Sequence, residues 1–273
     1  MPIRTEWVSY GEHSGYLAWP ERAVLPLPAV LVIQEVWGVD AHIEDVANRL
    51  AAAGYAALAP DLYARHGERP AAWSRDRVTE AQAFVNTRPS MNWTDANVRQ
   101  VEISRLPESK RRRVDETMDA LFASLLAGPV PGDQHVKPLL AATRFLRQAC
   151  PTTLGQKVAS VGFCMGGGLS ALLACHDPEL VGAVIFYGLS PPAELARRIH
   201  CRVCGFYGSL DQRINASVPP FAETMKTTGT SFESQIYQGA MHGFFNDNRS
   251  AYDVRAARDS FARLLEFLRQ VLE

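Results

Sequence analysis

Apolar residues along the chain form short continuous runs that alternate with stretches of helical spacing. Two such runs, at 29–34 and 55–59, flank a helical pattern at 42–53 that ends at Gly54. A run that is apolar at every residue is typical of a parallel strand buried on both faces. Residues 6–19 instead alternate around a Gly-Glu-His-Ser-Gly turn, which predicts an N-terminal antiparallel hairpin.

The same rhythm resumes after residue 136. We expect strands at 158–163, 180–186, 202–207 and 231–237, and helices at 137–149, 165–175, 217–228 and 253–272. Strand–helix alternation of this kind predicts an α/β fold, with a mainly parallel sheet, helices on both faces and right-handed crossovers.

Residues 64–135 break this rhythm. They carry no strand pattern, and helices are expected only at about 76–85 and 109–126. Their apolar content is too thin for a separate core, so we interpret them as a helical insertion or lid on a single domain spanning 1–273. The basic run 110–113 predicts a solvated helix face paired with nearby carboxylates, with substrate attraction or a partner surface as alternatives.

Composition narrows the function classes. The chain has 273 residues, 47% of hydrophobic types, and a net charge of −1, so no basic field indicates nucleic acid or an anionic membrane. No apolar run approaches transmembrane length, and the first residues lack the apolar region of a signal peptide. Five cysteines are too few for a disulfide framework, so we expect a cytoplasmic protein, either a monomer or a homodimer.

One glycine-flanked cysteine stands out. Gly162-x-Cys164-x-Gly166 follows an apolar strand and opens a helix, which is the nucleophile-elbow pattern with Cys in place of Ser. The Cys164 thiolate would attack an acyl carbon, and the amides of Met165 and Val36 could hold the resulting oxyanion. A structural core cysteine is the alternative.

An acid and a histidine follow in the α/β-hydrolase order. Asp211 comes after the strand at 202–207, and His242 after the strand at 231–237. His242 is the candidate base, and Asp211 would fix its tautomer and stabilise the imidazolium. Taken singly, Asp211 could be a turn or N-cap residue and His242 a loop histidine.

Two more polar residues follow strands, at the sheet edge where ligand sites form. Glu35 ends an apolar strand, so we expect its carboxylate either to face the pocket or to bear a cost of burial. It could accept the thiol proton directly when substrate binds; a surface glutamate is the alternative. Tyr187 ends the strand at 180–186.

Together these motifs resemble the dienelactone hydrolase (carboxymethylenebutenolidase) family of α/β-hydrolases. The matching pieces are Gln34-Glu35-Val36-Trp37-Gly38, Pro60-Asp61-Leu62-Tyr63, Gly162-Phe163-Cys164-Met165-Gly166-Gly167, Phe186-Tyr187-Gly188, Gly208-Ser209-Leu210-Asp211, His242-Gly243-Phe244 and the tail from Tyr252 to Ala257. The resemblance implies an α/β-hydrolase fold and cleavage of a small ester or lactone by a triad of Cys164, His242 and Asp211. It also implies Glu35 as partner of the thiol, Trp37 and Tyr187 in substrate binding, and neither a metal nor an organic cofactor.

The chain departs from the family in its arginines. Family members bind the substrate carboxylate with arginines, one of which lies a few residues after the catalytic histidine. Here Phe245-Asn246-Asp247 stand there, and the first arginine is Arg249. We therefore expect that carboxylate-bearing lactones are not specially favoured.

Two other functions remain open from the sequence. One is a thiol redox or peroxide-sensing protein that uses Cys164; the other is a non-catalytic binding module of α/β-hydrolase fold. The full set of candidate catalytic residues counts against the binding module. The pair Cys201-x-x-Cys204 has redox or metal spacing, but in a strand its side chains would face opposite sides.

Overall fold

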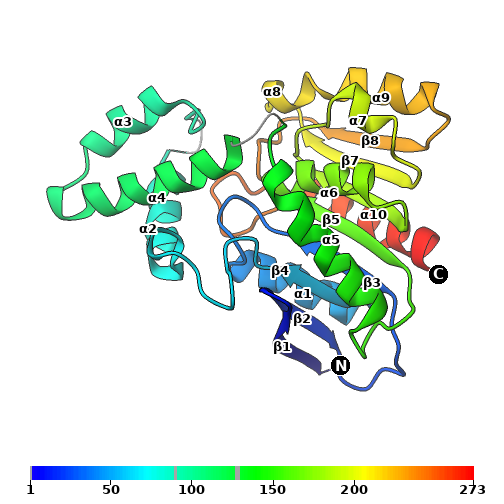
Figure 1. Cartoon of the computed structure of the whole chain (residues 1–273). Coiled ribbons are helices and arrows are strands. Elements are labelled where there is room, and N and C mark those ends of the chain that lie inside the picture. Colours follow the sequence, from blue (N-terminus) through cyan, green and yellow to red (C-terminus); the bar gives the residue numbers. More distant parts are fainter. Residues whose placement is uncertain (1, 89–90, 127–129) are drawn as a thin grey trace.

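A central sheet of eight strands organises the structure, a computed structural model that describes residues 2–88, 91–126 and 130–273. The strands follow the spatial order β1-β2-β4-β3-β5-β6-β7-β8 (Figure 1). They are β1 (Ile3–Tyr10), β2 (His13–Pro20), β3 (Ala29–Ile33), β4 (Ala56–Pro60), β5 (Val158–Phe163), β6 (Leu180–Phe186), β7 (Arg202–Gly208) and β8 (Phe232–Tyr237).

The helices connect these strands and extend the chain at two places. They are α1 (Ala41–Ala52), the short 3-10 helix η1 (Ala71–Trp73), α2 (Arg75–Asn86), α3 (Ala96–Ser104), α4 (Glu108–Leu126), α5 (Asp133–Gln148), α6 (Met165–His176), α7 (Ala193–Ala196), α8 (Gln212–Asn215), α9 (Val218–Thr227) and α10 (Val254–Leu272). No helix in the described part of the chain is long and apolar enough to cross a membrane.

The pairing of the strands confirms the predicted fold class. Strands β1, β2 and β4 pair antiparallel, and all pairs from β4 to β8 are parallel. In the centre, β3 and β5 run in register from Ala29 opposite Val158 to Ile33 opposite Gly162. Parallel strands end at the same edge, so the residues that follow β3, β5, β6, β7 and β8 are brought together there.

Both faces of the sheet are covered, which explains the continuous apolar runs. In β3, Val30 and Val32 belong to the cluster that packs under α1 and α10, whereas Leu31 and Ile33 belong to the cluster under α5 and α6. Alternate side chains of each strand therefore meet a different helical layer. Both layers therefore pack against the strands that carry the candidate residues.

The segment between β4 and α5 departs from the sheet. Figure 1 shows α2, α3 and α4 standing off to one side. Helices α2 and α4 match the two predicted helices, and they are joined by ion pairs from Arg113 to Asp76 at 2.9 Å and from Arg77 to Glu116 at 2.7 Å. The prediction missed α3, a polar helix whose start is capped by the Asp95 side chain. The role of this segment as a lid stays a prediction.

Candidate active site

Cys164 occupies the tight turn between β5 and α6. Its backbone has φ 54° and ψ −115°, a conformation that L-residues rarely adopt. A Cβ at Gly162 would lie 1.7 Å from the carbonyl oxygen of Gly166, and one at Gly166 would lie 2.2 Å from that of Ile33. Only glycine allows this approach of strand and helix, so the two glycines set the Cys164 thiol above the sheet edge.

The loops after β7 and β8 bring an acid to a histidine. Asp211 precedes α8, and its Oδ2 lies 2.5 Å from Nδ1 of His242. A carboxylate at Nδ1 favours the tautomer with Nε2 free, which is the arrangement that a general base requires. Both His242 and Cys164 line the same two cavities, so the structure brings these three predicted residues together.

The electrostatic environment of His242 favours imidazolium. Burial alone would lower its pKa, but the charge of a Cys164 thiolate and the hydrogen bonds to Asp211 and Cys164 outweigh burial and raise the pKa to about 10. The arrangement can therefore support a thiolate–imidazolium pair, in which the imidazolium is also able to return a proton.

Glu35 follows β3 but lies beneath the pocket and not in its lining. The residue is only 1% exposed, and its Oε2 accepts a hydrogen bond of 2.8 Å from Nδ2 of Asn246, while Oε1 has no partner among the described residues. Of the two outcomes that the sequence left open for this carboxylate, the structure shows burial, and the hydrogen bond from Asn246 offsets part of its cost. Sequence reasoning gave Asn246 no role beyond replacing an arginine.

Tyr187 and Trp37 are both buried and both contribute to the pocket walls. Tyr187 has φ 40°, and its ring lies 5.1 Å from the ring of His242. Burial, followed by the nearby charges of Glu35 and Cys164, raises the pKa of the Tyr187 phenol well above its ordinary value. The phenol is therefore neutral at physiological pH and can donate a hydrogen bond.

Neighbouring hydrogen bonds set the directions of the two amides that the sequence predicts as oxyanion donors. The Cys164 carbonyl accepts bonds from Gly167 and Gly168 along α6, so in the trans peptide the Met165 N–H points the opposite way, out of the helix N-terminus. The Glu35 carbonyl accepts a hydrogen bond of 3.2 Å from the Gly38 amide. Because the Val36 N–H belongs to the same peptide, it points in the opposite direction. Met165 lines the first cavity and Val36 the second.

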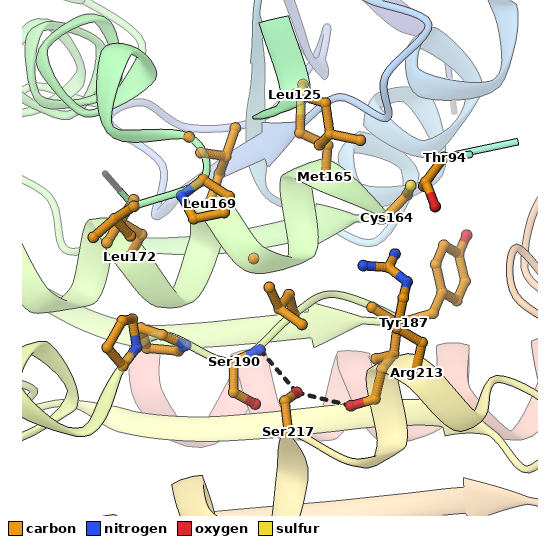
Figure 2. A pocket seen from close by; sticks show the side chains of 18 of the residues that line it. Thr94, Leu125, Cys164, Met165, Leu169, Leu172, Tyr187, Ser190, Arg213 and Ser217 are labelled. Atoms are coloured by element: carbon orange, nitrogen blue, oxygen red, sulfur yellow. Dashed lines mark hydrogen bonds between the residues drawn. The ribbon is translucent and has the colours of Figure 1, made fainter. Parts of the chain in front are cut away.

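Two chambers meet at the Cys164 thiol. The first encloses about 370 Å³ and extends along α6, as Figure 2 shows from Cys164 to Leu172. The second encloses about 360 Å³ and is lined by Trp37, Asp211 and Arg249 among others. Both volumes are of the size that small-molecule sites have.

Arg249 lies closer to the site than its spacing in the sequence suggested. The Asn246 amide donates a hydrogen bond to the Gly243 carbonyl, and the Arg249 amide donates one to the Asn246 carbonyl. These two successive turns fold the segment back. The Arg249 guanidinium thereby reaches within 3.0 Å of a Cβ placed on Gly243 and lines the second chamber. Distance along the chain was a poor guide here because the loop is compact.

The other cysteines carry no sign of a second centre. Cys201 and Cys204 are free; Cys201 precedes β7, Cys204 lies within it, and the two belong to different core clusters. Burial raises the pKa of Cys175, Cys201 and Cys204 to about 12, which keeps these thiols protonated. Over the described ranges, His, Cys, Asp and Glu side chains form no group of three that could hold a metal ion.

The sheet topology and the strand-end residues together define an α/β-hydrolase. A sequence model described as "Dienelactone hydrolase family" matches residues 13–272, so the chain belongs to that family and is a hydrolase of its kind. The resemblance inferred from the motifs is thereby confirmed.

Relatives support the same assignment. A protein of Saccharolobus solfataricus with the name "Putative carboxymethylenebutenolidase" is 34% identical, over 94% of this chain and 93% of its own length. A crystal structure titled "Putative Dienelactone Hydrolase", from Klebsiella pneumoniae, is 25% identical with a TM-score of 0.65 and covers 99% of this chain and 100% of its own. The metagenomic P91, titled a dienelactone hydrolase-like promiscuous phosphotriesterase, shares the fold at 21% identity, with a TM-score of 0.65 and full coverage of both chains.

Proposed function

We propose that the protein hydrolyses a small ester or lactone, without a cofactor, through an acyl-enzyme on Cys164. The observation that carries the proposal is the meeting of an elbow cysteine at φ 54° with a histidine whose Nδ1 lies 2.5 Å from an aspartate. Nucleophile, base and orienting acid are the parts that nucleophilic acyl transfer requires.

The first half of the reaction forms a thioester. The Cys164 thiol gives its proton to His242, and the sulfur attacks the carbonyl carbon, which moves an electron pair to the carbonyl oxygen. The amides of Val36 and Met165 stabilise this oxyanion. Collapse of the intermediate breaks the bond to the alcohol oxygen, which takes the proton from the His242 imidazolium.

The second half releases the acid. His242 removes a proton from water, and the hydroxide oxygen attacks the thioester carbon. The new tetrahedral intermediate expels the Cys164 sulfur, which recovers the proton from His242. Asn246 bonds Oε2 of Glu35 at 2.8 Å and Oε1 has no partner among the described residues, so Oε1 is the atom that could accept the thiol proton in the role proposed for Glu35.

Cys164→Ala tests the proposal directly. We expect the variant to keep its fold by circular dichroism and to lose hydrolysis of p-nitrophenyl acetate. Cys204→Ala is a matched control, because it removes a buried thiol of β7 that lines neither chamber, and it should keep the activity. Wild-type rates in folded Cys164→Ala would refute the assignment. Mass spectrometry of the wild type, quenched during turnover, should find the acyl group on Cys164.

The thiol redox function is the second candidate and has weaker support. Peroxidatic cysteines commonly act with a resolving thiol. Among the described residues that line the two chambers, Cys164 is the single cysteine. Turnover of hydrogen peroxide without any esterase activity would favour the redox function instead. A cytoplasmic location, and a monomeric or homodimeric state, stay predictions.

A further inference from the structure

The first chamber is aliphatic along the side that leads away from the thiol. Met165, Leu169 and Leu172 line it from one face of α6, since their spacing of four and three residues places them one above another. Leu189 from the loop after β6 and Ile214 from α8 complete this wall. At a rise of about 1.5 Å per residue, the lined face of α6 is on the order of 10 Å long.

Most polar groups of this chamber are already bonded or stand near its thiol end; the exception is the buried Ser190 hydroxyl, which has no hydrogen-bond partner among the described residues. Ser217 Oγ accepts from the Ser190 amide at 3.2 Å and donates to the Ile214 carbonyl at 2.7 Å (Figure 2). Its hydroxyl therefore has no free donor for a ligand. Arg213 is exposed and also borders the second chamber, as Cys164 does, so it stands where the two chambers join.

The proposed chemistry uses this chamber only at its thiol end, where the Met165 amide and His242 stand beside Cys164. The aspartate of the triad, the Val36 amide and Trp37 all border the second chamber, which has a comparable volume of about 360 Å³. Water in an aliphatic cavity lacks hydrogen-bond partners, so a chamber of this kind is better filled by an apolar ligand. Its occupant must be joined to the reacting carbonyl, because the chamber opens at the Cys164 thiol.

We propose that the first chamber binds an aliphatic chain of the substrate, so that the preferred substrates are esters with an unbranched chain of several carbons. This inference rests on the hydrolase function proposed above and adds the substrate class to it. Each methylene that leaves water for an apolar site favours binding by about fourfold. Butyrate has two methylenes more than acetate, so if this binding is expressed in the transition state, kcat/KM should rise by about 15-fold from acetate to butyrate.

The test uses two ester series with the full-length protein. In one series the acyl chain of p-nitrophenyl esters grows from acetate to butyrate and octanoate; in the other, acetate esters carry alcohols of the same lengths. We expect kcat/KM to rise with chain length in at least one series, and that series identifies the arm of the ester that enters the chamber. Equal or falling values in both series would overturn the proposal.

Variants locate the effect in the chamber. Leu189→Trp fills it and should reduce the ratio of butyrate to acetate kcat/KM at least fivefold, whereas Leu172→Ala enlarges it and should move the optimum to longer chains. Leu195→Trp is the matched control, since Leu195 is also partly buried against the same core but lines a different hollow. Unchanged ratios in folded Leu189→Trp and Leu172→Ala would overturn the proposal.

Cys164→Ala separates the two levels of inference. Acetate hydrolysis that survives in this variant refutes the proposed function itself. If Cys164→Ala is inactive and kcat/KM of the wild type does not depend on chain length, only the aliphatic-chain proposal is refuted.

Discussion

Replacing Asp211 with asparagine tests the electrostatic arrangement of the site. The carboxylate of Asp211 lies 2.5 Å from Nδ1 of His242, and the imidazole is about one third exposed, at 30%. Asparagine keeps the shape of the side chain and removes its charge. The variant therefore asks how much the negative charge contributes to forming imidazolium during attack by Cys164.

The magnitude follows from the contact. Two unit charges about 4 Å apart, roughly the separation of the charge centres in such a pair, attract by about 4 kcal/mol at an effective dielectric constant of about 20. Partial exposure of the His242 ring reduces this value, so we take about 3 kcal/mol. Since about 1.4 kcal/mol is a factor of ten, kcat/KM of Asp211→Asn should fall on the order of 10².

The assay is hydrolysis of p-nitrophenyl acetate at pH 7, together with titration of the His242 imidazole by NMR. The pKa of His242 should fall in Asp211→Asn, because the hydrogen bond and the charge of Asp211 both raise it. Asp177→Asn is the control: Asp177 is buried and pairs with Arg147 at 3.0 Å, outside the lining of both chambers. Asp177→Asn should lose stability and keep its rate per folded molecule. A folded Asp211→Asn with kcat/KM within threefold of wild type would refute the reasoning.

Three further predictions concern the surroundings of the proposed triad. Asn246→Ala leaves a buried carboxylate without its donor and should lower the free energy of unfolding in urea by about 1–3 kcal/mol, whereas Ala at the exposed Asn248 should change it by less than about 0.5 kcal/mol. The pKa of His242 is raised to about 10, so its stabilising contribution is complete below about pH 6.5 and is lost as the pH rises towards 10; the free energy of unfolding should decrease across this window, and less so in Cys164→Ala, which lacks a charge that raises this pKa. With Arg249 in the second chamber, we now expect carboxylate-bearing lactones to be preferred over neutral ones, and Arg249→Met should reduce that preference by about tenfold in kcat/KM; a preference that is unchanged in the variant would show that Arg249 binds no carboxylate.

The sequence was a good guide wherever a residue follows a strand. Nearly continuous apolar runs located β3, β5 and β6, because strands buried under two helical layers carry few polar residues; the exception, Ser160 in β5, is hydrogen-bonded to Ser170. The carboxyl ends of parallel strands lie at one sheet edge whatever the side-chain packing. Cys164, Asp211 and His242 could therefore be grouped from the sequence alone.

The contacts made by loops could not be predicted in the same way. The pairing of Asn246 with Glu35 joins residues 211 positions apart through the exact course of one compact loop. The first chamber likewise depends on how α6, α8 and the loop after β6 pack, and none of its leucines differs in sequence from an ordinary core leucine. Helix α3 was missed because its stability comes from a cap and from packing on α4, and its own apolar pattern is weak.

Backbone strain gives independent reason to place function at this edge of the sheet. Of the described non-glycine residues, His66, Cys164 and Tyr187 have positive φ, and His66 lies in an exposed turn. Cys164 and Tyr187 follow the neighbouring strands β5 and β6. The backbone amide of each donates a hydrogen bond to a carbonyl of the next strand, at 3.0 Å and 2.8 Å. Such conformations cost on the order of 1 kcal/mol or more each and persist only where the surroundings enforce them. A core that needed only to be stable would not retain two of them side by side, whereas a site that must aim a thiol and hold a phenol beside an imidazole has use for both.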